Sequence, residues 1–201
     1  MIIYLKVLKC FFIVDMFFTG LHWIIDSFEY ADYWSEIRNS LKHHNQPHLR
    51  GNDTYTSILN MTIKSTLVIL LFYDFFSFLL GYKIYLSAFD IIIYFIFVLT
   101  AFLNHKYVHS PSNKVPAPFK FLQEMLLVDK KYHRIHHSSE IKPKNFSFLF
   151  GLIDRPCSYL FNASYKKYFG KWWAIIRLST ILLIIFGIQW LNIYLDSLLI
   201  K

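Results

Sequence analysis

Four stretches of this chain are long and apolar enough to cross a lipid bilayer, which takes about 20 residues of α-helix. They comprise residues 2–25, 65–82, 84–104 and 173–195. Only 17% of all residues are charged, below the roughly 25% of soluble domains, and 55% are hydrophobic, which excludes a disordered chain. We therefore expect an all-α fold, a multi-pass membrane helix bundle with about four transmembrane helices.

We expect one membrane-embedded domain over residues 1–201, and the ends of the four stretches indicate how they are connected. The first stretch contains Asp15 and is followed by no small-residue cleavage site, which favours a retained helix over a signal peptide. The second and third are separated by Lys83 or a few residues, so we expect a tight helical hairpin with Asp74 and Asp90 inside it. No internal repeat or flexible linker divides the chain.

The basic residues predict the orientation of the bundle. Residues 105–172 contain 12 Lys/Arg against 4 Asp/Glu, which accounts for the whole net charge of +8. Positive charge gathers on the cytoplasmic side of membrane proteins, so we expect 105–172 and the loop 26–64 there. Lys6 and Lys9 argue weakly for the opposite orientation. Within the basic segment, residues 119–128 have helical apolar spacing and are predicted to lie along the membrane surface.

All nine histidines fall on this predicted cytoplasmic side or at the membrane ends that face it. In three of their groups, at 22–26, 105–109 and 133–137, the spacings are those of neighbours on one helix face, three or four residues apart. The groups are His22 with Asp26, His43 with His44 and His48, His105 with His109, and His133 with His136 and His137. We therefore expect several helices to present imidazoles to one shared point, as a histidine-rich cap.

Imidazole nitrogen suits zinc, copper, iron and nickel. Eight or so imidazoles are too many for one tetrahedral zinc, and two metals with open positions for oxygen fit the number better. The two cysteines cannot form a cysteine zinc site.

The alternative interpretations of the histidines are a solvated helix face, binding of anionic lipid, or zinc or copper binding in a transporter subunit. Clustering at one membrane face argues against a transporter, whose ligands lie near the midplane.

The motifs and their order resemble the Kua/CarF-type lipid desaturases, whose best-known activity is plasmanylethanolamine desaturase. The resemblance runs from Asp15 to about Phe161. It rests on DMFFTGLHWIID (15–26), HHNQP (43–47), NHKYVH (104–109), HRIHH (133–137) and GLIDRP (151–156). The HxxxH and HxxHH motifs are shared with the sterol desaturase and fatty acid hydroxylase group, whereas the His-Trp-x-x-Asp element and HHxxP point to this family.

This resemblance implies a membrane enzyme with a di-iron centre of two Fe ions that uses O₂ and two electrons to desaturate a lipid chain. In the best-known member the product is the vinyl ether bond of a plasmalogen, formed from an alkyl ether phospholipid. Asp26 would be a catalytic residue, as a ligand or as a partner that orients an imidazole. By position, the metal ligands would be His22, His43, His44, His105, His109, His133, His136 and His137.

The chain departs from the family pattern at two places. The family usually has a further histidine a few residues after HHxxP, where this chain reads LRGNDTY (49–55), and His48 is the candidate replacement. It also tends to have one shortly after HRIHH, where residues 138–145 contain none.

The expected partners are a membrane phospholipid substrate and an external electron donor, which the resemblance implies is cytochrome b5-like or ferredoxin-like. No flavin, haem or iron–sulfur motif is present, and the basic residues lie beside membrane anchors, which argues against nucleic acid. The alternatives are a lipid or sterol hydroxylase with the same di-iron chemistry and a non-enzymatic, histidine-rich membrane metal-binding protein.

Overall fold

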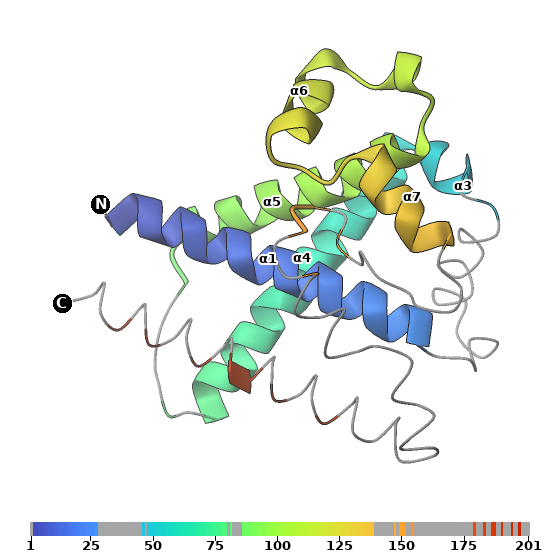
Figure 1. Ribbon diagram of the computed structural model, residues 1–201. Helices are drawn as coiled ribbons and strands as arrows, with labels where there is room; N and C mark the ends of the chain where they lie inside the picture. Colours follow the sequence, from blue (N-terminus) through green and yellow to red (C-terminus); the bar gives the residue numbers. More distant parts are fainter. Residues whose placement is uncertain are drawn as a thin grey trace.

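The computed structural model describes most of the first two thirds of the chain and isolated positions beyond it. The described residues are 2–27, 46, 48–79, 81, 86–138, 147, 149–151, 154, 179, 183, 186, 187, 190, 194 and 197, with the side chains of 2, 21, 23–27 and 138 left out. All regular structure in these residues is helical (Figure 1). The expected all-α fold is therefore confirmed for the described part of the chain.

Two of the described helices are long and apolar enough to cross a membrane: α4 (Tyr55–Leu79) and α5 (Ala88–His109). At a rise of 1.5 Å per residue they are about 37 and 33 Å long, against about 30 Å of hydrocarbon. They correspond to the second and third predicted spans. The α4 helix begins ten residues earlier than predicted. Seven residues, 80 to 86, and the cap Ser87 separate the two helices, so the connection is longer than the tight turn we expected.

The α1 helix (Ile2–Ser27) covers the first predicted span. Over the described residues, it is not among the helices that are long and apolar enough to cross a membrane. The fourth predicted span, 173–195, lies almost wholly outside the described residues. Two of the four expected spans are therefore found.

The α1 and α5 helices run side by side in the same direction (Figure 1). At their N-terminal ends, Lys6 Nζ lies 3.4 Å from Asp90 Oδ2. Asp90 also closes a capping box with Ser87, which satisfies the first backbone N–H groups of α5. Asp90 is therefore a helix cap and ion-pair partner rather than a mid-span carboxylate, whereas Asp74 is exposed on α4.

The core between α1 and α5 is built from two apolar stripes of helical spacing. Cys10, Val14 and Phe18 of α1 are at most 1% exposed. They pack with α5 residues of the same core cluster, which are Tyr94, Val98 and Ala101. The next position on each stripe is a histidine, His22 on α1 and His105 on α5. The packing that joins the two helices therefore delivers both imidazoles to the same end.

Short elements complete this end of the molecule. They are α3 (His48–Gly51), the 3₁₀ turn η2 (Ser112–Lys114), α6 (Ala117–Met125) and α7 (Lys130–Ser138). The α5 helix is central, because α1, α3, α4 and α7 all contact it. Buried Asn104 of α5 donates to the Val128 carbonyl and accepts from Gln123, which ties the chain on either side of Leu127 to α5.

Candidate metal centre

Three helices bring histidines together at one end of the described molecule. His22 comes from α1, His105 and His109 from the last turns of α5, and His133, His136 and His137 from α7. Asp129 starts α7 by accepting a hydrogen bond from the Tyr132 backbone N–H at 2.6 Å. The three- and four-residue spacing within α7 then places its histidines toward α5.

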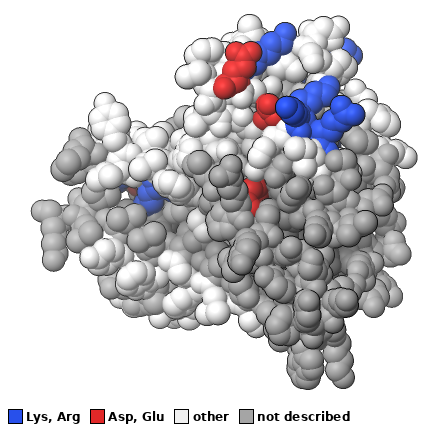
Figure 2. All heavy atoms as spheres, in the orientation of Figure 1, with Lys and Arg blue, Asp and Glu red and all other residues white. Residues whose placement is uncertain are grey.

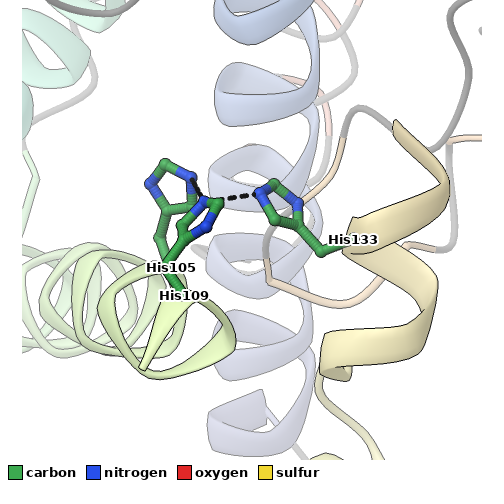
Figure 3. Close-up of side chains that lie close together, drawn as sticks. All are labelled: His105, His109 and His133. Carbon is green, nitrogen blue, oxygen red and sulfur yellow. Dashed lines mark hydrogen bonds between the residues drawn. The ribbon is translucent and has the colours of Figure 1, made fainter. Parts of the chain in front are cut away.

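The Nε2 atoms of four of these histidines form a continuous series of close contacts. The distances are 3.2 Å from His105 to His109, 3.0 Å from His109 to His133 and 3.1 Å from His133 to His137. Figure 3 shows the rings of His105 and His109 from α5 facing that of His133 from α7. Nitrogen atoms of these three residues all lie within 4.8 Å of one another.

Hydrogen bonding alone does not account for this series. The Nε2 atom of an imidazole has either one proton or one lone pair in the ring plane, so it makes one hydrogen bond. The Nε2 atoms of His109 and His133 each have two imidazole neighbours. A metal cation bound by lone pairs from all the rings resolves the conflict. Ring nitrogens at about 2.1 Å from a metal, and about 90–109° apart, lie about 3.0–3.4 Å from one another, which matches the observed spacing. The residues present therefore fit a metal.

His22 and His136 form a second pair beside this group. Their ring centroids are 4.5 Å apart, and the centroid of the His133 ring lies 6.0 Å from that of His22 and 5.7 Å from that of His136. Both side chains are less than 5% exposed. The described imidazoles thus extend over more space than a single metal ion occupies.

Burial favours the neutral, metal-binding form of the central histidine. His133 is 1% exposed. This burial, and then the nearby imidazoles of His109, His136, His22 and His137, lower its pKa well below the usual value of 6.5. A neutral ring keeps the lone pair that a metal requires.

The outer face of α7 is basic. Lys130, Lys131 and Arg134 are exposed, and Figure 2 shows blue side chains gathered on the surface over this helix. These positive charges belong to the basic segment 105–172 of the sequence. The exposed basic residues and the inward-facing histidines therefore lie on adjoining faces of one nine-residue helix.

The structure places the predicted site residues as follows. It brings together His22, His105, His109, His133, His136 and His137. His43 and His44 lie outside the described residues, as does the side chain of Asp26, whose backbone belongs to the last turn of α1. His48 is exposed at the start of α3.

Four polar residues beside the histidines were not predicted as site residues. They are Asp15, Ser147 and Asp154, which are fully buried, and the half-buried Tyr132, and hydrogen bonds join all four. Burial, and the charge of Asp15, raise the pKa of Asp154 to about 6, while hydrogen bonds from Ser147 and Tyr132 act in the opposite direction. Asp15 lies seven residues before His22, two helical turns on the same face, which was the one signal available in the sequence.

Comparison with known proteins gives one match. A family model described as the lipid desaturase domain matches residues 11–162, well over half of the chain. Among curated proteins and among solved structures, no chain matches this one. The matched segment contains every histidine of the sequence and the four hydrogen-bonded residues Asp15, Tyr132, Ser147 and Asp154.

Proposed function

The chain belongs to the lipid desaturase domain family, and we propose that it is a membrane-embedded enzyme with a di-iron centre. The single observation that supports this most strongly is the convergence of four imidazole Nε2 atoms from two helices, at 3.0–3.2 Å from neighbour to neighbour. Family membership gives that cluster its chemistry, because removing hydrogen from an alkyl chain needs a metal-based oxidant.

The proposed ligands fall into two groups. His105, His109, His133 and His137 hold one iron. His22 and His136 hold the other together with His43 and His44, and Asp26 is the proposed catalytic partner that orients or joins this group. Bound iron would supply the O₂ chemistry, in which two hydrogens from a saturated carbon pair, together with two external electrons and two protons, reduce O₂ to two waters and leave a carbon–carbon double bond.

The protein itself contributes ligand geometry and exclusion of water. Four of these six described imidazoles are less than 9% exposed, which keeps bulk water from the reaction. The packed apolar stripes of α1 and α5 end at His22 and His105, so the imidazoles of these two residues adjoin an apolar core. No acid or base among the described residues can break an unactivated C–H bond.

We further propose the substrate and the membrane arrangement. The Kua/CarF-like motifs favour an alkyl ether phospholipid, with the vinyl ether of a plasmalogen as the product. The domain comprises residues 1–201 with four spans, and the histidine end faces the cytoplasm, as the basic segment predicts. The basic face of α7 serves to hold a lipid phosphate or to dock an acidic donor of the cytochrome b5 or ferredoxin type.

The test is turnover by the purified, iron-loaded protein in lipid nanodiscs. The substrate is an alkyl ether phospholipid, electrons come from a chemical reductant with a mediator, and lipids are measured by mass spectrometry. We expect an O₂-dependent product that is lighter by two hydrogens and contains an acid-labile vinyl ether. A product heavier by one oxygen would identify a hydroxylase. No O₂-dependent product from any ether or acyl lipid, with zinc or copper bound in place of iron, would favour a metal-binding protein.

A further inference from the structure

Two carboxylates are buried beside the histidine cluster and are not among the proposed ligands. Asp15 of α1 is 0% exposed and Asp154 is 1% exposed. Burying a carboxylate costs several kcal/mol unless hydrogen bonds compensate. Both are compensated by one short segment around Ser147, although Asp15 and Ser147 are 132 residues apart in sequence.

Ser147 joins the two carboxylates through its hydroxyl and its backbone N–H. Its hydroxyl donates to Asp15 Oδ1 at 2.7 Å and accepts from the backbone N–H groups of Leu149 and Gly151, both at 3.1 Å. Its backbone N–H donates to both oxygens of Asp154 at 2.9 Å. One donor and two acceptor sites are what a hydroxyl offers. The Phe150 N–H adds a second bond to Asp15 Oδ1 at 3.0 Å.

Tyr132 joins α7 to the same group. Its hydroxyl donates to Asp154 Oδ2 at 2.8 Å. The ring lies against the turn at Gly151, where an added Cβ would be 3.2 Å from the hydroxyl oxygen. Val128, just before α7, donates its N–H to the Leu149 carbonyl at 2.8 Å. The described residues 147, 149–151 and 154 therefore connect α1 to α7 through hydrogen bonds at several points.

The positions along each helix relate these contacts to the histidines. Asp15 and His22 lie on one face of α1, seven residues or about 10 Å apart. Tyr132 and His136 lie on one face of α7, four residues or about 6 Å apart. The His22 and His136 rings meet at 4.5 Å. The α1 and α7 helices are thus connected twice on the same pair of faces, once by hydrogen bonds and once by imidazoles.

We infer that Asp15, Tyr132, Ser147 and Asp154 form a positioning network that sets the rotation and separation of α1 and α7, and thereby holds His22 and His136 in ligating geometry. This inference rests on the proposed metal centre. These are positioning residues, since no metal or substrate contact is required of them. Hydrogen-bonded groups behind metal ligands typically alter metal affinity by about 10- to 100-fold when they are removed.

The experiment is titration of the metal-free, full-length protein in detergent with cobalt(II), whose visible absorption reports ligand number and geometry. The variants are Tyr132→Phe and Ser147→Ala, with Ser147→Thr as the conservative variant that keeps the hydroxyl. The matched control is Tyr55→Phe, which removes a hydroxyl that lies 3.3 Å from the Tyr107 hydroxyl and outside the network. Thermal unfolding of each metal-free variant is measured in parallel.

We expect Tyr132→Phe and Ser147→Ala to weaken cobalt binding about 10-fold or more and to shift the spectrum at saturating cobalt. Tyr55→Phe should stay within about twofold of the original chain, and Ser147→Thr should recover most of the affinity. If Ser147→Ala fails to fold, Tyr132→Phe is the deciding variant, because it removes only the hydroxyl oxygen that bonds Asp154 and keeps the ring. Unchanged affinity and spectrum in Tyr132→Phe, even with a lower Tm, would overturn the positioning role alone. Failure of the original chain to bind cobalt would overturn the metal centre itself.

Discussion

His109 is the residue on which the proposed centre depends most directly. Its Nε2 atom lies between those of His105 and His133, at 3.2 and 3.0 Å. Removing this ring takes away the shared neighbour of His105 and His133 and interrupts the series between α5 and α7. His133 also has two neighbours in the series, whereas His105 and His137 lie at its ends.

We therefore predict that His109→Ala loses at least one of two bound irons and all desaturation, while the chain still inserts into membranes. The matched control is His48→Ala, because His48 is exposed on α3. It should keep full metal content and turnover. Iron per chain after reconstitution, together with lipid mass spectrometry, measures both. Full activity in His109→Ala would place the metal elsewhere, whereas loss of iron in His48→Ala would make His48 the replacement for the missing family histidine.

Gly151 is a second residue with a specific structural demand. Its φ of 72° lies in the left-handed region, and an added Cβ would be 3.2 Å from the Tyr132 hydroxyl. We predict that Gly151→Ala destabilises the fold by about 1–2 kcal/mol, measured as a lower Tm in detergent. Gly20→Ala is the control, since Gly20 is helical with nothing within 4 Å of an added Cβ. Its Tm should be unchanged or higher, and an equal fall in both variants would contradict the argument.

At the scale of elements, most helices could be predicted from the sequence because hydrophobic length and histidine spacing are local signals. The helices α4 and α5 and the helical HRIHH motif were anticipated, and the helix predicted over 119–128 is found as α6, which ends at Met125. The beginning of α4 was missed because residues 55–64 mix Thr, Ser, Asn and Lys with apolar residues, which hides the helical pattern. The length of the α4–α5 connection was missed because residues 84–87 are apolar enough to look like a span.

The start of α5 gives a prediction for an element boundary. Ser87 caps the helix, and its partner Asp90 also pairs with Lys6 of α1. We predict that Ser87→Ala lowers stability by about 1 kcal/mol, seen as a lower Tm in detergent. Thr100→Ala in the middle of the same helix is the control, because its hydroxyl bonds only the Ile96 carbonyl one turn back. A larger loss in Thr100→Ala than in Ser87→Ala would contradict the capping role.

The α6 helix gives a prediction about the membrane surface. Phe121 is 61% and Met125 70% exposed, while Gln123 anchors the helix to Asn104, about 7 Å from the end of α5. Interfacial helices lie at about that depth in a bilayer. We predict that a fluorophore at Met125→Cys is quenched by lipids with a quencher on the acyl chain, whereas one at exposed Lys114→Cys is not. The background is Cys157→Ser, since Cys10 is buried. Equal quenching at both sites would contradict this placement.

At the scale of the whole molecule, the gathering of histidines follows from helix direction. The α1 and α5 helices run parallel, with Lys6 and Asp90 paired at one end and His22 and His105 at the other. The sequence predicted this gathering because alternating spans return to the same side. It could not predict the link between Asp15, Ser147 and Asp154, because a contact across 132 residues leaves no local pattern. For the same reason the fit of His22 against His136 required the structure.

The central claim is that this cluster holds two irons for O₂-dependent lipid chemistry. The most direct measurement is the metal content of the detergent-purified protein, by mass spectrometry calibrated per mole of chain, before and after reconstitution with iron. The account predicts about two irons per chain, lost in His109→Ala and kept in His48→Ala. One zinc or copper per chain, unaffected by added iron, would contradict it.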